Sequence, residues 1–268
     1  MRTVKMSFWV YYDHLGKLLV VNFLCACAVL VPLMFAHAAF VSGNPRWMLW
    51  CAVPMLLTVV VVVFPLSQVG LLWLIKELLE TRDGSVKTAF VGIRKFGIRA
   101  VLLGCFYALF SFFLASSVWF YGVVLGATAP LLGYSLSAAA LWAQAFLLFT
   151  AVVAFPALVN KNAAIGDVLK MAAVLTVDNP LFLAGVFIAM TFLMAFFLLP
   201  PTLLFFSFAP LAALQGSAYE ILSRKYAAIQ AHLAAGGNRD KSFQIDFGDD
   251  DDEYLCRGFR DLLFPWKE

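Results

Sequence analysis

Long apolar intervals alternate with short clusters of charged residues along this chain. Lys17 and Arg46 enclose 28 residues without a charge, and Arg46 and Lys76 enclose 29. Two longer intervals without a charge hold 61 residues (100–160) and 41 residues (179–219). Because a transmembrane helix needs about 20 apolar residues, each shorter interval predicts one membrane span and each longer interval predicts two.

Glycine and proline residues divide the two longer intervals. The first contains a turn signal between Gly126 and Pro130, and the second contains Pro200 and Pro201 at its middle. We therefore predict an all-α, polytopic membrane protein with about six transmembrane helices. The expected spans are residues 18–40, 47–75, 100–126, 134–159, 180–199 and 202–220.

Local signals predict where some of these helices begin and end. Asn44 and Asn179 each precede a proline, which is typical of an N-cap followed by the first helical residue. The second span should continue as a helix beyond the membrane through Glu80, and Gly84 can end it. The apolar run 18–40 exceeds the core of a signal peptide, which has about 7–15 residues, so we expect a retained first span.

The composition excludes a soluble globular domain. Hydrophobic residues make up 63% of the chain and charged residues 13%, with a mean hydropathy of +0.89, whereas soluble domains have about 25% charged residues. We predict three regions: an interfacial cytoplasmic segment (1–17), a transmembrane helical domain (18–235), and a cytoplasmic acidic linker with an amphipathic tail (236–268). The lipid bilayer is therefore the expected surrounding of the chain, and no nucleic-acid partner is expected.

The positions of lysine and arginine predict the orientation in the membrane. Of the 19 such residues, 18 lie in segments 1–17, 76–99, 161–170 and 224–267, which fall on one side of the predicted spans. Only Arg46 lies in a loop on the opposite side, and no acidic residue does. Because cytoplasmic loops carry the excess of positive charge, we predict that both termini face the cytoplasm.

The pattern also favours an internal repeat. Amphipathic stretches at 5–16, 85–98 and 166–178 each precede a predicted helical hairpin and are expected to lie in the plane of the inner headgroups. The second span of each hairpin carries a proline that can kink it, namely Pro65, Pro156 and Pro210. A three-fold hairpin repeat explains this order; the alternative is that proline is simply common in membrane helices.

The sequence contains no arrangement of residues typical of catalysis. No Asp, Glu, Lys or Arg lies deep in a predicted span, which argues against ion-coupled transporters, pumps and voltage sensors. No hydrolase elbow, phosphate-binding glycine loop, metalloprotease helix or calcium loop is present. The five cysteines are expected to act as small hydrophobic residues in helix packing. We therefore expect a protein that is not an enzyme and has no cofactor or metal.

Two sets of residues are candidates for function. The first consists of polar residues within the spans, which either form interhelical hydrogen bonds or line a small cavity between kinked helices: Gln68, Gln144 and Gln215. The second is an apolar stripe behind the acidic run 249–253, which we expect to form a short helix over residues 254–266 on the cytoplasmic face. Its expected docking residues are Tyr254, Leu255, Phe259, Leu262, Phe264 and Trp266.

Short motifs resemble those of a known family. The segments Tyr12–Asn22 and Asp83–Ser85 are similar to motifs of the YesL-like family of six-span bacterial membrane proteins. The segments Asp167–Ala172 and Asp178–Pro180 resemble those of related multi-span families, and the similarity covers roughly residues 8–230. The resemblance implies a bacterial cytoplasmic (inner) membrane location. The family has no established activity, but its genes often accompany carbohydrate uptake systems, so the resemblance also implies an accessory role beside such systems.

Two hypotheses about function remain open at the level of the sequence. The first is a non-enzymatic integral membrane subunit or accessory protein, associated with a carbohydrate transport assembly and binding a protein partner through its C-terminal tail. The alternative is a passive small-molecule facilitator or lipid-handling protein. The first is favoured by the uncharged spans and by the apolar stripe of the tail, and the alternative by kinked helices that can surround a path.

Overall fold

The computed structural model describes residues 2–197, 204, 206–234 and 253–257. These residues are almost entirely helical and contain no strand. Four helical stretches are long and apolar enough to cross a membrane, and a helix pair bent by 102° makes up to five. They are Leu15–Val41, Pro45–Glu80, Val86–Thr128, Pro130–Lys161, and the pair Ile165–Asp178 with Pro180–Ala195.

The helices follow one another with few intervening residues. In chain order they are α1 (Arg2–Asp13), α2 (Leu15–Val41), α3 (Pro45–Trp47), α4 (Val53–Thr58), α5 (Phe64–Glu80), α6 (Val86–Trp119), α7 (Gly126–Thr128), α8 (Pro130–Lys161), α9 (Ile165–Asp178), α10 (Pro180–Phe197), α12 (Phe208–Ala234) and α13 (Glu253–Cys256). Turns of π-helix join α3 to α4, α4 to α5 and α6 to α7, at Met48–Ala52, Val59–Val63 and Phe120–Leu125.

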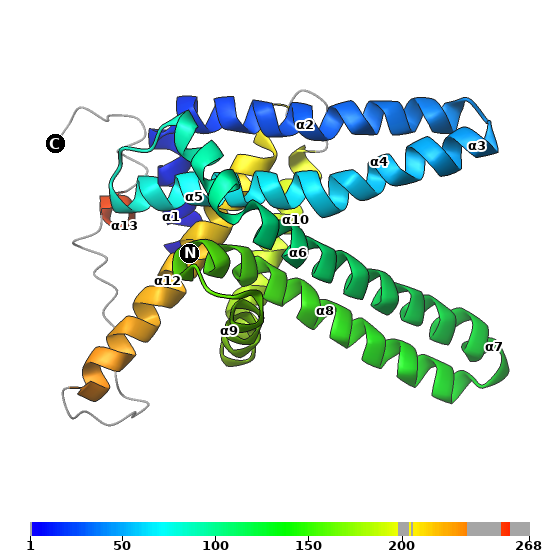
Figure 1. The fold of residues 1–268 in the computed structure, drawn as a ribbon. Helices are drawn as coiled ribbons and strands as arrows, with labels where there is room; N and C mark the ends of the chain where they lie inside the picture. The colour runs from blue at the N-terminus through cyan, green and yellow to red at the C-terminus, as the bar shows by residue number, and fades with distance from the viewer. Residues whose placement is uncertain (1, 198–203, 205, 235–252, 258–268) are drawn as a thin grey trace.

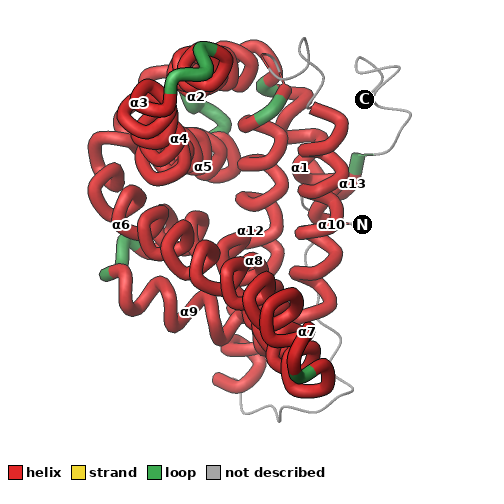
Figure 2. The backbone as a smooth tube through the Cα atoms, turned by 90° about the vertical axis from the view of Figure 1, so that its right-hand side faces the viewer, coloured by secondary structure: helices red, strands yellow, loops and turns green. Residues whose placement is uncertain are grey.

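Two long hairpins dominate the molecule. One is formed by α2 with α3–α5 and the other by α6 and α7 with α8, and they diverge toward tips at α3 and α7 (Figure 1). The opposite end holds α1, α9, α13 and the charged half of α12; we call it the charged end. Seen from the tips, α1, α10 and α13 lie on one flank of the molecule, away from α6 (Figure 2).

The tightest packing in the fold lies between α5 and α6. A Cβ atom added to Gly104 would lie 2.3 Å from Cγ of Pro65, and one added to Gly92 would lie 2.5 Å from Cβ of Trp73. Small residues of this kind let two helix backbones approach closely, which is how helices associate in lipid without a hydrophobic driving force. The interface of α5 with α6 therefore depends on glycine.

The beginning of α6 differs from the sequence prediction. Residues 85–98 do not form a separate interfacial helix, because Val86–Trp119 is one continuous helix. Its N-terminus is fixed by a capping box in which the backbone N–H of Ser85 donates to Oγ1 of Thr88 at 3.1 Å. No glycine-proline break follows, so the helix continues directly into the apolar stretch.

Two predictions of helix ends meet different outcomes. The N-cap at Asn44 is confirmed, because its side chain accepts a hydrogen bond from the backbone N–H of Arg46 at 3.0 Å. Gly84 does not end α5; Arg82 adopts the left-handed conformation instead, with φ of 61°. Gly84 has another role, because a Cβ atom there would lie within 2.9 Å of side-chain carbons of Leu74 and Leu78.

The pair α10 and α12 differs from the two hairpins. Its second helix is described from Phe208, and its second half carries Glu220, Arg224 and Lys225, so α12 is not among the apolar helices named above. Figure 1 shows α12 running obliquely into the charged end, not toward the tips. The described residues therefore establish a membrane-embedded helical protein with four or five long apolar helices.

Candidate functional site

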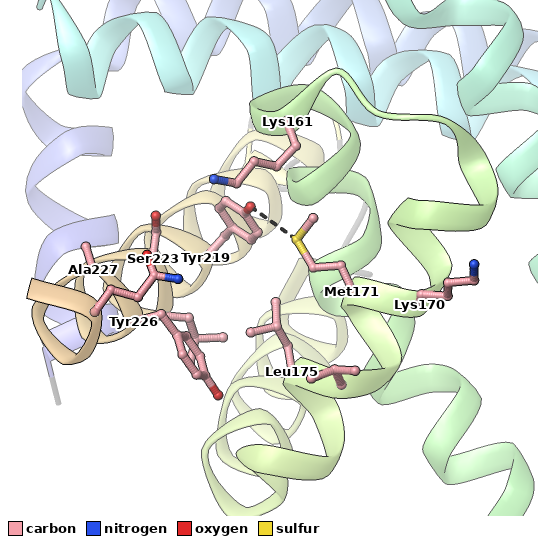
Figure 3. A pocket seen from close by; sticks show the side chains of 11 residues that line it. Lys161, Lys170, Met171, Leu175, Tyr219, Ser223, Tyr226 and Ala227 are labelled. Carbon is pink, nitrogen blue, oxygen red and sulfur yellow. Dashed lines mark hydrogen bonds between the residues drawn. The ribbon is translucent and has the colours of Figure 1, made fainter. Parts of the chain in front are cut away.

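A pocket of about 440 Å³ lies at the charged end, between the end of α8, the helix α9 and the second half of α12 (Figure 3). The end of α8 contributes one residue, α9 four and α12 six. The lining residues are Lys161, Lys170, Met171, Val174, Leu175, Tyr219, Leu222, Ser223, Tyr226, Ala227 and Gln230. Volumes of this size are typical of sites for small ligands.

The turn between α8 and α9 sets one wall of this pocket. Asn162 ends α8 in the left-handed conformation, with φ of 51°. The guanidinium of Arg99, from α6, donates to the carbonyl oxygens of Asn162 and Ala163 at 3.2 Å each, and to Oδ1 of Asn162 at 2.7 Å. Two of these charge-assisted bonds satisfy backbone carbonyls of the turn and the third holds the Asn162 side chain, so Arg99 fixes the turn from which α9 begins.

A second group of hydrogen bonds joins the end of α9 to α12. The amide nitrogen of Asn179 donates to the hydroxyl oxygen of Tyr226 at 2.8 Å, and that hydroxyl donates to Oδ2 of Asp178 at 3.0 Å. The ammonium group of Lys225 donates to Oδ1 of Asn179. Asn179 occupies the N-cap position predicted for the helix at Pro180, because its carbonyl oxygen accepts from the backbone N–H of Leu183 at 3.1 Å. Its side chain binds α12 and the Leu175 carbonyl.

The pocket combines positive charge with an apolar floor. Its lining contains two lysines and no carboxylate, and Met171, Val174, Leu175 and Leu222 supply the apolar part. The hydroxyl of Tyr219 donates to the sulfur of Met171 at 3.8 Å (Figure 3). A thioether is a weak acceptor, so this hydroxyl is a donor that a better acceptor can recruit. The arrangement suits an anionic group attached to an apolar one.

A second feature of the charged end is the first turn of the tail, α13, which packs on α1. Tyr254 and Leu255 are each only 5% exposed. The ammonium group of Lys5 donates to the carbonyl oxygen of Leu255, and the guanidinium of Arg257 lies 2.5 Å from Oδ2 of Asp13. These contacts show that the tail begins on this protein's own charged end.

His14, between α1 and α2, also faces the tail. Its Nε2 atom lies 3.5 Å from the hydroxyl oxygen of Tyr254. Burial lowers the pKa of His14, the charges of Lys17 and Arg82 lower it further, and Asp13 opposes them. These effects favour the neutral ring, in which an unprotonated Nε2 can accept a hydrogen bond from the tyrosine.

The remaining residues predicted in the tail, and the three glutamines, are placed as follows. Phe259, Leu262, Phe264 and Trp266 lie outside the described residues. Gln144 donates to Oγ of Ser111 at 3.3 Å, so it forms an interhelical hydrogen bond between α8 and α6. Gln68 in α5 and Gln215 in α12 are buried. The Oε1 atoms of all three have no hydrogen-bond partner within the described residues, and none of the three lines the pocket between α8, α9 and α12.

Asn22 is a structural residue whose partners the sequence did not predict. It is completely buried in α2, and its Oδ1 accepts hydrogen bonds from the backbone N–H groups of Phe208 at 2.7 Å and Ala209 at 2.9 Å. Its amide nitrogen donates to the carbonyl oxygen of Leu204 at 2.9 Å. A polar residue in an otherwise apolar span indicates a buried hydrogen bond, but the sequence does not show that its partners are backbone groups at the start of α12.

Known proteins add nothing to this geometry. Searches of family models, curated proteins and solved structures find no match to this chain. Within the part of the chain that the structure describes, no group of three His, Cys, Asp or Glu side chains is placed to hold a metal ion. The function must therefore be inferred from the pocket and from the contact between α13 and α1.

Proposed function

We propose that this chain is a non-enzymatic integral membrane subunit or accessory protein that binds a protein partner through its C-terminal tail. The observation that carries the proposal is the burial of Tyr254 and Leu255 against α1. Because the chain is held at this point, the residues that follow Arg257 start from a fixed position at the charged end. They include five large apolar residues in eleven: Phe259, Leu262, Leu263, Phe264 and Trp266.

The proposed topology has six spans, with both termini in the cytoplasm of a bacterial cell and the tips of the hairpins outside. It is supported by the partition of charge: Arg46 belongs to α3 at one tip, whereas α1 and α13 belong to the charged end. In this proposal α10 and α12 supply the fifth and sixth spans and complete a three-fold series of hairpins. The bacterial inner membrane and the link to carbohydrate uptake rest on the resemblance to the YesL-like family alone.

Labelling of single cysteines tests this topology. In a variant whose five native cysteines are replaced by alanine, Ser42→Cys, beside the tip at α3, should react with an impermeant maleimide in intact cells. Asp83→Cys, beside the end of α5, should react only after permeabilisation. Both side chains are exposed. A failure to react therefore shows that the membrane keeps the reagent away, and not that the side chain is buried in the protein. Labelling of Asp83→Cys in intact cells is the result that contradicts the orientation.

Purification of the full chain from its native membrane tests the partner. We expect a protein to copurify at a fixed ratio with the wild type and to be lost from the double variant Phe264→Ala with Trp266→Ala. The matched control is Leu131→Ala in α8, which removes an apolar side chain that is 86% exposed at the opposite end of the molecule. Equal recovery of the partner by both variants would refute docking through the tail.

The alternative function, a passive small-molecule facilitator or lipid-handling protein, is favoured by a different observation. An apolar pocket of about 750 Å³ lies between α1, α10 and α12, lined by residues such as Phe8, Phe192 and Leu214. A lone oligomer without a second protein, obtained in the same purification, would favour this function over the first.

A further inference from the structure

We propose that the pocket between α8, α9 and α12 binds the phosphate of an anionic phospholipid headgroup, with the lipid's glycerol and acyl carbons against its apolar floor. This inference is independent of the partner-binding function, because it concerns neither α1 nor the tail. It rests on three observations: the two lysines that line the pocket, the weak sulfur acceptor of the Tyr219 hydroxyl, and the exposed apolar residues of α9.

The charges around the pocket favour an anion. Lys161 and Lys170 line it and form no ion pair within the described residues. The neighbouring acids are engaged elsewhere or lie outside the lining: Glu220 pairs with Arg224 at 2.9 Å, and Asp178 accepts from the hydroxyl of Tyr226 at 3.0 Å. A lysine ammonium is a common phosphate ligand, so an anion here gains two charges without displacing an existing partner.

The two lysines are not equivalent. In Figure 3 the side chain of Lys161 extends over the pocket on the side of Tyr219, whereas Lys170 lies beyond Met171 and points away. Lys161 is also the last residue of α8, which places its ammonium group where the long apolar helix ends. Lys161 is therefore the main charged ligand, and Lys170 contributes at longer range.

Hydroxyl groups complete the polar part of the site. The Tyr219 hydroxyl, now directed at the sulfur of Met171, can turn to a phosphate oxygen, which is a much stronger acceptor. Ser223 lies one helical turn further along α12 and lines the same pocket. One ammonium group and two hydroxyls on a single side match the oxygens of a phosphate monoanion.

The apolar part distinguishes a lipid from a soluble phosphate. Val174 and Val177 of α9 are 58% and 67% exposed, and Val174 lines the pocket beside Met171 and Leu175. α9 is bent by 102° from the apolar helix α10, as expected of a helix that lies along a membrane surface. Basic pockets between helices on the cytoplasmic side are typical binding sites for anionic headgroups.

Hydrogen bonds hold α9 in place at both of its ends. Arg99 holds the start of α9 through Asn162 and Ala163, and Asn179 holds its end against Tyr226. The start of α9 is thus held to α6 and its end to α12, by hydrogen bonds that do not involve the lining lysines. A preformed site loses less conformational entropy when a ligand binds.

Native mass spectrometry of the full chain in a neutral detergent tests the proposal. The protein is titrated with phosphatidylglycerol, phosphatidylcholine and inorganic phosphate. We expect phosphatidylglycerol to bind in preference to phosphatidylcholine. Lys161→Gln should weaken that binding about five-fold, the loss expected for one lysine near an anionic lipid, and Lys161→Arg should retain it. Ser223→Trp, which fills the pocket without changing its charge, should remove it.

The control is Lys87→Gln, which removes an exposed charge from α6 outside the pocket. Its phosphatidylglycerol binding should equal that of the wild type. Equal weakening by Lys87→Gln and Lys161→Gln would show attraction to net charge and overturn the site. Binding of inorganic phosphate at the same concentrations, with no preference between the two lipids, would overturn the lipid assignment. An unchanged affinity in Lys161→Gln that still elutes as folded protein would also overturn it.

Discussion

Replacement of Gly104 by leucine should separate α5 from α6 and destabilise the whole fold. A Cβ at this position meets Cγ of Pro65 at 2.3 Å and the carbonyl oxygen of Val61 at 3.3 Å. A proline ring has no rotamer that moves it aside, and the carbonyl belongs to the backbone, so the two helices must move apart. Overpacking of this kind costs about 3 kcal/mol, or a melting temperature lower by roughly 10 °C for a chain of this length.

Thermal unfolding of the purified protein in detergent, followed by tryptophan fluorescence, measures the effect. The matched control is Gly185→Leu in α10, where a Cβ atom meets nothing within 4 Å. That variant adds the same side chain to the same kind of helix and should melt within about 2 °C of the wild type. Similar melting of both variants would show that the close approach of α5 and α6 does not hold the fold.

Replacement of Asn22 by leucine should loosen the start of α12. The leucine side chain has a similar size, but it leaves the N–H groups of half-buried Phe208 and buried Ala209 without this acceptor. Each unpaired buried group costs about 1–3 kcal/mol, and the first turn of a helix has no acceptor of its own for these groups. Hydrogen exchange of peptides covering residues 206–214 should accelerate at least ten-fold.

Asn160→Leu is the control for this variant. It makes the same substitution in α8, but Asn160 donates only to the Pro156 carbonyl of its own helix, at 2.9 Å. Exchange in α12 should be unchanged by it. If Asn22→Leu leaves exchange at residues 206–214 as slow as in the wild type, the start of α12 is held by packing and not by the Asn22 amide.

The sequence predicted the long helices because their signal is local. Intervals without charge match α2, the stretch Pro45–Glu80, and α8, and the turn predicted between Gly126 and Pro130 lies at the junction of α7 and α8. The path of α12 could not be predicted in this way. An oblique helix and a perpendicular one have the same apolar pattern, and the contacts of Asn22 with α12 join residues about 186 positions apart.

The candidate residues show the same limit. Tyr254 and Leu255 were predicted from a local apolar stripe, and they are buried at the charged end. The pocket was missed because three separate helices form it, although Lys161 at the end of a span was visible in the sequence. Gln144 was predicted either to form an interhelical hydrogen bond or to line a cavity; in the structure it donates to Ser111 of α6.

The position of α1 has a consequence for synthesis of the chain. This helix is the first of the described helices to be made, yet the elements that cover it, α12 and α13, are the last. Its buried side chains Met6, Trp9 and Val10 cannot be fully covered before more than 190 further residues have been translated. Until then this amphipathic surface has only lipid or a chaperone to contact. A chain that terminates early therefore keeps it uncovered, which distinguishes an incomplete protein from a finished one.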